Sequence, residues 1–269
     1  MKRLLLLTLL SPTVYAAEDL PLWEVGVGGG ATRYADYRGS DEYTNYAIAL
    51  PYLVYRGEKL RLDGSGITAK LLDHPRLKLR MSGSGSLPSD SDSNEARKGM
   101  DDLDYVGELG PSLDIILSNP KNISNFRVAL ELPVRYGVHT DFKRVGTVGW
   151  TAAPSLDVAQ RWDLDGGYRV GYSTALTAYL ATRQYHDYFY GVNPNEATLT
   201  RPTYTPAGGF GGVSLSLGGF VRKGRYSVGA YAALDDVSKA QFAKGPLHRK
   251  DTNYSVGVGF SVRLFESKR

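Results

Sequence analysis

The residues best suited to catalysis or metal binding are sparse in this sequence. Its four histidines are His74, His139, His186 and His248, and it contains no cysteine. No two histidines stand four residues apart, the spacing that puts two ligands on one helical face, and no thiolate completes a zinc site. We therefore expect no metal ion, no cofactor and no catalytic centre, and we predict that the protein is not an enzyme.

Three weaker signals for chemistry are present. His139 or His186 could pair with a serine of a neighbouring strand, as in a lipid hydrolase on the outer wall of a barrel, but no local pattern marks such a serine. The acidic segment SDSDSNE, residues 89–95, could bind a divalent cation, although acidic, serine-rich loops are usually solvated. The segment AGGFGGVSLSLGG lacks the Lys-Ser/Thr of a phosphate-binding loop, so its glycines indicate a strand.

Charged residues recur at alternate positions of apolar segments. In NFRVALELPVRYG, residues 125–137, the even positions from 126 to 136 are apolar, and the odd positions include charged residues. A period of two indicates a strand with one apolar and one charged face. Extended to the other segments, this parity gives a charged set that includes Arg80, Glu108, Arg127, Glu131, Arg135, Asp157, Arg161 and Arg169. Such residues would line the lumen of a membrane barrel, where they either brace a plugged interior by ion pairs or line a narrow pore that favours anions.

The elements that carry these residues are long. The alternating pattern returns in about twelve segments from Trp23 to Leu264. Strands that cross a membrane need about 9–11 residues, whereas strands of soluble proteins average about 5–6. The apolar faces are therefore expected to meet lipid, including that of the segment 46–54, which carries Tyr46, Ile48, Leu50, Tyr52 and Val54. A soluble two-sheet protein is the alternative reading of the same pattern.

The connections sort by length. Short ones lie at 56–59, 72–75, 118–122, 163–167 and 222–225, and long polar ones at 33–43, 88–101, 137–148, 182–208 and 236–251. Short periplasmic turns and long outer loops are typical of bacterial outer-membrane barrels, which have an even number of strands. The alternation holds if residues 59–72 form two short strands joined at 64–66. We predict an all-β protein, a transmembrane antiparallel up-and-down β-barrel of about 12 strands, over residues 17–269.

The N-terminus predicts export. Lys2 and Arg3 precede an apolar run from Leu4 to Leu10, and Ala16 ends a small-residue cleavage motif, so residues 1–16 are expected to be a cleaved signal peptide. Loss of Lys2 and Arg3 lowers the formal charge from +4 to +2. A charge so close to zero gives no reason to expect a nucleic-acid partner.

Several stretches resemble the MipA/OmpV family of outer-membrane proteins, also called MltA-interacting proteins. The segment GGGATRYADYRGSDEY contains the family's Tyr-x-Gly-Ser as Tyr37, Gly39 and Ser40, and RKGMDDLDYVGELGPSLDIIL contains Glu108, Gly110 and Pro111 of its Glu-Leu-Gly-Pro element. The segment YHDYFYGVNPNEA resembles the family's Tyr-x-x-x-Tyr-Phe-Gly-Val, with Tyr190 inserted before Gly191. The resemblance extends over nearly all of the mature chain.

This resemblance implies a barrel in the outer membrane of a Gram-negative bacterium, in contact with outer-membrane lipid. A founding member is described as a scaffold that joins a murein hydrolase, a lytic transglycosylase, to a penicillin-binding protein, and other members are described as surface antigens or adhesins. We therefore expect a structural scaffold for murein-remodelling and murein-synthesising enzymes, with a narrow channel for small solutes and a surface adhesin as alternatives. No catalytic residues are implied.

Overall fold

A computed structural model describes residues 21–63, 66–119 and 125–268 of the chain. The predicted signal peptide, residues 1–16, lies outside the described residues. The described chain forms one antiparallel sheet with a single α-helix, as predicted for an all-β protein. The thirteen strands are β1 Trp23–Ala35, β2 Tyr43–Arg56, β3 Leu60–Asp63, β4 Gly66–Asp73, β5 Leu77–Ser86, β6 Tyr105–Ile116, β7 Arg127–Thr140, β8 Val145–Ala152, β9 Ser155–Leu164, β10 Tyr168–Ala181, β11 Gly209–Lys223, β12 Tyr226–Asp236 and β13 Thr252–Glu266.

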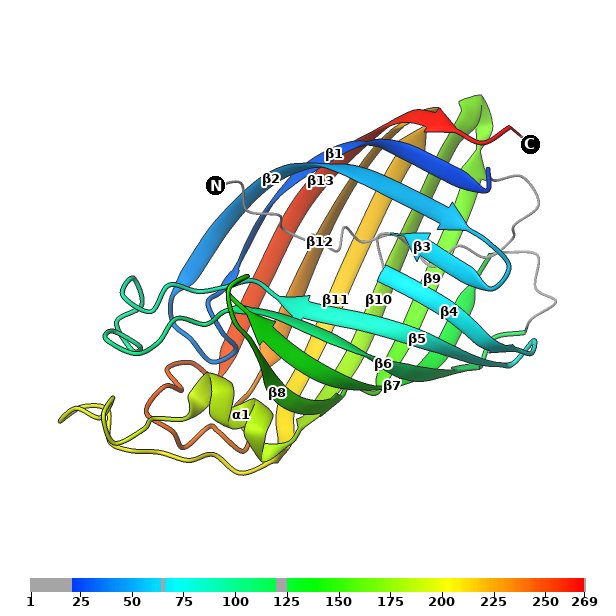
Figure 1. The fold of residues 1–269 in the computed structure, drawn as a ribbon. Helices are drawn as coiled ribbons and strands as arrows, with labels where there is room; N and C mark the ends of the chain where they lie inside the picture. The colour runs from blue at the N-terminus through cyan, green and yellow to red at the C-terminus, as the bar shows by residue number, and fades with distance from the viewer. Residues whose placement is uncertain (1–20, 64–65, 120–124, 269) are drawn as a thin grey trace.

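The sheet closes into a barrel (Figure 1). The first strand, β1, pairs with both β2 and the last strand, β13, and the other strands pair with their neighbours along the chain, except that β8 and β9 do not pair with each other. Strands β8 and β9 share one position, because each pairs with β7 on one side and with β10 on the other. They are separated at Ala153–Pro154, where proline lacks the N–H that a central strand needs. Thirteen strands thus fill twelve positions of the wall, which confirms the predicted number.

The predicted split of residues 59–72 is also confirmed. Strands β3 and β4 are short and form a hairpin in which Asp63 faces Gly66. In contrast, the predicted long loop at 137–148 is wrong, because β7 and β8 extend through most of it and leave only residues 141–144 as a turn. A helix, α1, Arg183–Tyr190, forms inside the long connection from β10 to β11.

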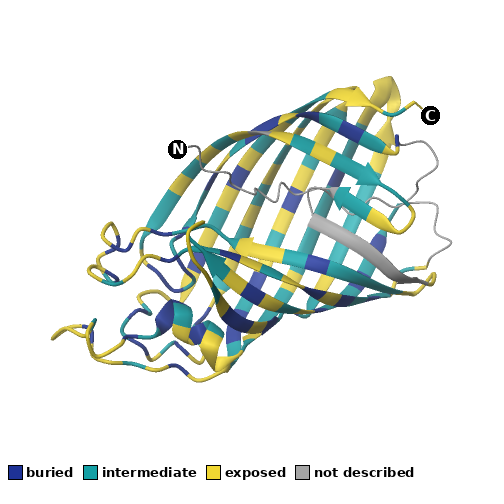
Figure 2. Cartoon of the chain, viewed as in Figure 1, coloured by how far each residue is buried: buried dark blue, intermediate teal, exposed yellow. Residues whose placement is uncertain are grey.

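Exposure alternates along the strands, as expected for a wall with a lipid face and a lumen face (Figure 2). On β7, Val134, Tyr136 and Val138 are exposed on the outside, and Arg127 is buried inside. The expected outward face of β2 is wrong: Val54 is paired with the inward-facing Glu24, and Tyr52 covers the inner side of Gly26. Leu53 of β2 is instead exposed outside. The apolar alternation of β2 is therefore real, but its larger side chains point into the barrel.

The long connections gather at one end of the barrel and the short turns at the other (Figure 1). We assign the loop end to the outer side of the membrane, because outer-membrane barrels carry their long loops there. The principal buried cluster of apolar residues lies at this end, not at mid-barrel: Tyr37, Leu103, Val106, Val148, Phe189, Tyr190, Val192, Val237, Ala240, Phe242 and Leu247. We call this cluster and the loops that form it the cap. Among the described residues, no helix is both long and apolar enough to cross a membrane.

Candidate functional site: a capped and braced lumen

The cap is held by stacked and edge-on aromatic rings. The rings of Tyr190 and Phe242 stack with centroids 3.6 Å apart, and Tyr37 meets Tyr190 edge-on at 6.0 Å. Tyr190 is the last residue of α1, Phe242 lies in the β12–β13 loop and Tyr37 lies in the β1–β2 loop. Aromatic pairs of this kind add to the free energy of apolar burial. Loops far apart in the sequence therefore form one packed unit over the outer end of the barrel.

Buried polar groups fix the cap loops to one another. Tyr37 donates a hydrogen bond to the carbonyl of Leu247 at 2.8 Å, and Tyr190 donates to the carbonyl of Arg38 at 2.9 Å. The guanidinium of Arg97 is buried and donates to the carbonyls of Phe189 and Asp101, each at 3.0 Å. Because buried donors without partners are costly, this satisfied network favours one arrangement of the loops.

The acidic segment, residues 89–95, is part of the cap. The Asn94 amide donates to Asp36 Oδ2 at 2.8 Å and to Ser40 Oγ at 3.2 Å. Asp90 accepts from backbone N–H groups two and three residues on, an ordinary turn arrangement. In the described part of the chain, no group of three or more acidic or histidine side chains is arranged to hold a metal ion. The segment joins the β5–β6 loop to the β1–β2 loop.

The family-signature residues around Tyr37 form the corner of the cap. Gly39 has φ +93°, a conformation that side chains disfavour, and its N–H donates to Asn253 Oδ1 at 2.5 Å. Its carbonyl accepts from the N–H groups of Arg249 and Lys250. Ser40 is fully buried, and its hydroxyl accepts from the N–H of Glu42. These signature residues therefore shape an outer loop.

Glu108 connects the cap to the wall. It points inward from β6 and accepts hydrogen bonds from Tyr185 of α1 at 2.9 Å and from Thr151 of β8 at 2.7 Å. Two residues further along β6, a Cβ on Gly110 would lie 2.0 Å from the carbonyl oxygen of Val134, so only glycine fits there.

The two remaining signature residues lie on the outer wall and at the end of α1. The next residue on β6, Pro111, is exposed on the outer wall. Gly191 ends α1 by donating to the carbonyl of Asp187 at 2.8 Å, and a Cβ there would lie 2.5 Å from that oxygen. The positions predicted from the family signature thus have structural roles in wall and cap.

Below the cap, ion pairs brace one side of the lumen. Arg80 of β5 contacts Asp114 of β6 at 2.6 Å and Glu131 of β7 at 2.7 Å. Arg127 of β7 contacts the same two carboxylates at 3.8 and 3.0 Å. Asp157 lies inward on β9, where Ser155 donates to it at 2.5 Å. Of the predicted lumenal charges, Arg80, Arg127 and Glu131 therefore form one network, in which Asp114 is the second carboxylate that the two arginines share.

The remaining predicted charges lie elsewhere in the lumen. Arg135 donates to Ser82 Oγ at 3.1 Å, nearer the cap. Arg169 pairs with Asp163 near the periplasmic end, and Arg161 faces inward on the same part of β9. These residues lie at separate levels, so the described side chains do not form one continuous track of charges.

A second ionic cluster lies at the periplasmic mouth, and the sequence reasoning missed its centre. Glu24 of β1 is buried and contacts Arg56 at 2.8 Å, Arg222 at 3.0 Å and Arg263 at 3.7 Å. Arg263 also contacts Glu266 at 2.7 Å. The alternation of Glu24 with Trp23 and Val25 in the sequence could have indicated that Glu24 points into the lumen. Three arginines around one glutamate leave this mouth positively charged.

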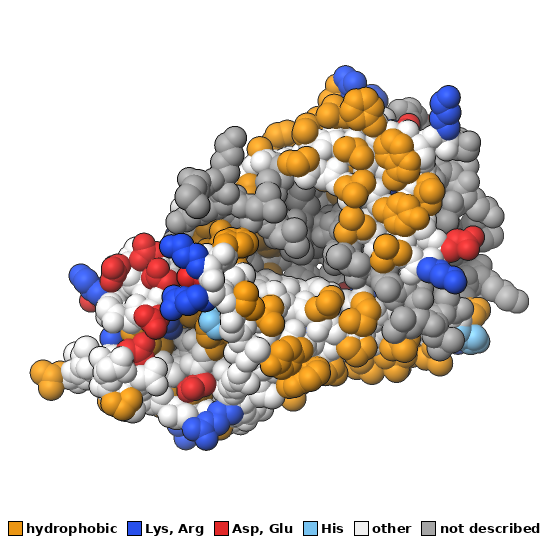
Figure 3. All heavy atoms as spheres, viewed as in Figure 1, with side chains coloured by type: hydrophobic (Ala, Val, Ile, Leu, Met, Phe, Trp, Pro, Cys, Tyr) orange, Lys and Arg blue, Asp and Glu red, His pale blue; other side chains and the backbone are white. Residues whose placement is uncertain are grey.

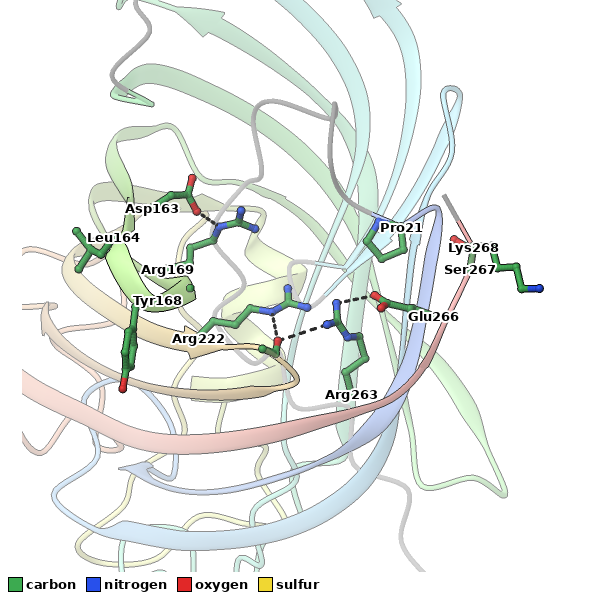
Figure 4. A pocket seen from close by; sticks show the side chains of 12 residues that line it. Pro21, Asp163, Leu164, Tyr168, Arg169, Arg222, Arg263, Glu266, Ser267 and Lys268 are labelled. Atoms are coloured by element: carbon green, nitrogen blue, oxygen red, sulfur yellow. Dashed lines mark hydrogen bonds and ion pairs between the residues drawn. The ribbon is translucent and has the colours of Figure 1, made fainter.

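A cavity of about 600 Å³ opens beside this cluster (Figure 4). We call it the vestibule. It is lined by Pro21, Asp163, Leu164, Gly167, Tyr168, Arg169, Arg222, Gly224, Arg263, Glu266, Ser267 and Lys268. Four of these residues are cationic and two are acidic. The vestibule is therefore suited to an anionic group that arrives from the periplasm.

The histidines lie outside both ionic clusters. Among the hydrogen bonds of the described residues, none joins a histidine to a serine hydroxyl. His139 contacts Asp104 at 2.7 Å, and His248 contacts Asp251 at 2.8 Å. His186 is buried in the cap, 2.8 Å from the carbonyl oxygen of Ala207, and burial lowers its pKa. His74 lies in an exposed turn.

Comparison with solved structures finds other barrels at low identity. The NanC porin is 7% identical, with a TM-score of 0.38 over 90% of this chain and 100% of that one. The outer-membrane protease OmpT from Escherichia coli is 9% identical, with a TM-score of 0.33 over 94% and 99%. A Pseudomonas aeruginosa FadL homologue is 8% identical, with a TM-score of 0.31 over 91% and 90%. Values this low say nothing about the function of the chain.

Sequence comparison identifies the family. No curated protein matches the chain. The family described as MltA-interacting protein MipA, in contrast, matches residues 26–264, almost the whole of the described barrel. This match agrees with the signature positions found in the cap and on β6, and with a closed wall whose apolar face points outward. The protein is an outer-membrane β-barrel and belongs to the MltA-interacting protein MipA family.

Proposed function

We propose that this barrel is a non-enzymatic scaffold that holds murein enzymes, a lytic transglycosylase and a penicillin-binding protein, at its periplasmic mouth. The observation that carries the proposal is the contrast between the two ends. The outer end is covered by a packed cap, whereas a positively charged vestibule opens at the end with the short turns. The family description, MltA-interacting protein, supports the same kind of partner.

The vestibule enlarges the surface that a partner could contact at the periplasmic end. A specific interface buries roughly 1,200 Å² or more, and short turns alone provide little surface. A concave mouth adds area, and its unbalanced cations add electrostatic attraction that speeds association and selects an acidic segment. We therefore infer that the partner inserts an acidic, protruding segment between Arg169 and Lys268.

Binding to purified murein enzymes tests this proposal. The double variant Arg169→Ala/Lys268→Ala removes two vestibule cations, and the half-exposed pair of Arg169 with Asp163 contributes little to stability. We expect the refolded variant to bind about tenfold more weakly than the unmodified protein, because two charge contacts are lost. The matched control is Lys143→Ala/Arg144→Ala, which removes two exposed cations from the outer turn. Equal binding by both double variants, or no binding by the unmodified protein, would refute the proposal.

A channel gated by the cap is a second candidate, favoured by the vestibule that leads into the lumen. The measurement is single-channel conductance in a planar bilayer. A channel predicts a silent unmodified protein and discrete steps once the cap is loosened, for which Phe242→Ala is the simplest variant. Silence from both folded proteins would exclude the channel and leave the scaffold.

A further inference from the structure

The wall of the barrel is incompletely paired between β2 and β5. Strand β2 pairs with β1 from Tyr43 to Tyr55, but with β3 only through Tyr55 and Arg56. Strand β5 pairs with β4 only through residues 78–80, and from Met81 to Ser86 it pairs with β6 alone. The short hairpin β3–β4 fills only part of the interval (Figure 1), and the space-filling view is hollowed on this face (Figure 3).

This opening lies in the outer half of the wall and has defined ends. On the periplasmic side it is closed by the β3–β4 hairpin. On the outer side Tyr46 of β2 reaches across and donates a hydrogen bond to the carbonyl of Pro88 at 2.6 Å, while Tyr34 stacks on Tyr46. Unpaired strand edges that face hydrocarbon are costly, because no water satisfies their N–H and C=O groups. Between these two ends, the edges of β2 and β5 therefore form an incompletely sealed part of the wall.

The lumen behind the opening is apolar and uncharged along β2. Strand β2 turns Tyr46, Ile48, Tyr52 and Val54 inward, all of them partly exposed. Their partners on β1 include Gly26 and Gly30, which have no side chain. The inward positions of the next strands are also small or uncharged until the ends: Ser227, Gly229, Tyr231 and Ala233 of β12, and Ser255, Gly257, Gly259 and Ser261 of β13. Charged side chains lie on the β5 side of the opening instead, where Arg80 pairs with Asp114 of β6.

Two buried hydroxyls mark the outer end of the opening. Ser86 is the last residue of the open β5 edge, and Tyr105 begins the neighbouring strand. Within the described part of the chain, neither hydroxyl has a hydrogen-bond partner. Buried polar groups are nearly always paired, so these two indicate a polar group that the protein itself does not supply.

We propose that the opening admits the acyl chain of a membrane amphiphile from the surrounding lipid into the lumen. The chain lies along the inward face of β2 over the glycines of β1, and its polar head lies toward Ser86 and Tyr105. A partner strand added to the open edge is the competing occupant. It would satisfy the backbone of β2 but would leave Ile48 and its inward neighbours facing an aqueous lumen, so the apolar lining favours an acyl chain.

Tryptophan quenching by lipids brominated in their acyl chains tests this proposal. In a background where Trp23, Trp150 and Trp162 are replaced by Phe, single tryptophans are placed at Ile48 (inward, beside the opening), Ala49 (outward on the same strand) and Ala175 (inward on β10). In phosphatidylcholine vesicles with dibrominated chains, we expect Ile48→Trp to be quenched nearly as strongly as Ala49→Trp. Ala175→Trp should be protected. Protection of Ile48→Trp equal to that of Ala175→Trp would overturn the proposal, and it is also the result that an added strand predicts.

A binding measurement keeps the proposal testable if a tryptophan variant fails to fold. The probe is a fluorescent polyene fatty acid, titrated into the detergent-solubilised, folded protein. We expect Ile48→Ser to weaken binding about tenfold, because a buried aliphatic contact is lost. The matched control, Leu53→Ser, changes the outward face of the same strand and should bind as the unmodified protein does. Equal affinity of Ile48→Ser and the unmodified protein, or an equal loss in both variants, would overturn the proposal.

Discussion

Replacing Phe242 by alanine should open the cap without unfolding the barrel. The ring of Phe242 is 2% exposed, stacks on Tyr190 at 3.6 Å and meets His186 edge-on at 5.2 Å. Removing a buried phenylalanine side chain costs about 3–5 kcal/mol. The strands of the wall lose no backbone pairing, so this free energy is lost from the cap alone.

The expected magnitude is large enough to measure by proteolysis. Each 1.4 kcal/mol changes an equilibrium about tenfold, so the open population of the cap should rise by about 10²- to 10³-fold. Arg97 is buried in the cap and donates to the carbonyls of Phe189 and Asp101, so trypsin reaches it only when the cap opens. When opening and closing are fast relative to cleavage, the cleavage rate follows the open population.

The assay compares trypsin cleavage after Arg97 in the unmodified protein and in two variants. Phe242→Ala should be cleaved at least about a hundredfold faster. Phe142→Ala is the matched control, because Phe142 lies in the outer turn between β7 and β8 and is 67% exposed. Equal rates at Arg97 for Phe242→Ala and Phe142→Ala would refute the idea that stacked rings hold the cap closed.

Three further predictions concern the lumen, the helix and pH. Arg80→Ala removes one of the two arginines that contact both Asp114 and Glu131 and should lower the free energy of unfolding in urea by about 3 kcal/mol, whereas the exposed Arg76→Ala should change it little. Gly191→Ala places a Cβ 2.5 Å from the Asp187 carbonyl oxygen and should shift α1 and accelerate cap cleavage. Burial lowers the pKa of His186, so its neutral form stabilises the cap. That contribution is complete above the ordinary histidine pKa of about 6.5 and falls as pH decreases toward the lowered value. Cap cleavage should therefore rise between pH 7.5 and 5.5, and His186→Gln should reduce this dependence.

The strands of the wall could be predicted from the sequence, because the alternation that marks a strand lies within a short segment of the chain. A period of two and the lengths of the connections sufficed for the strand number, the divided β3–β4 segment and the inward direction of Arg127 and Glu131. The wrong assignment of the β2 face also follows from the local nature of this pattern. Parity along one strand does not say which face is inside, so the apolar face of β2 was assigned to lipid. The deciding contact, Val54 beside Glu24, joins two strands and is invisible in either one.

The cap could not be predicted, because it depends on contacts between distant loops. Tyr190, Phe242 and Tyr37 look like ordinary loop aromatics in sequence, and α1 is too short to give a convincing helical period. The signature positions gave the available hint. Gly39, Ser40 and Gly191 stand where backbone conformation and close packing restrict the residue, which is what a fixed cap requires.

The cap and the side opening depend on each other. Across the interval where β2 and β5 are unpaired, the outer loops supply the missing connection: Asn94 bonds to Asp36, the N–H of Glu95 donates to Glu42 Oε1 at 2.6 Å, and Tyr46 bonds to Pro88. On the other side of β5, Arg80 anchors that edge strand to β6 and β7. A barrel with this opening in its wall thus keeps its shape through its loops and its ion pairs. Loosening the cap should therefore also widen the opening between β2 and β5. We expect Phe242→Ala to increase the quenching of a tryptophan at position 48 by brominated lipid.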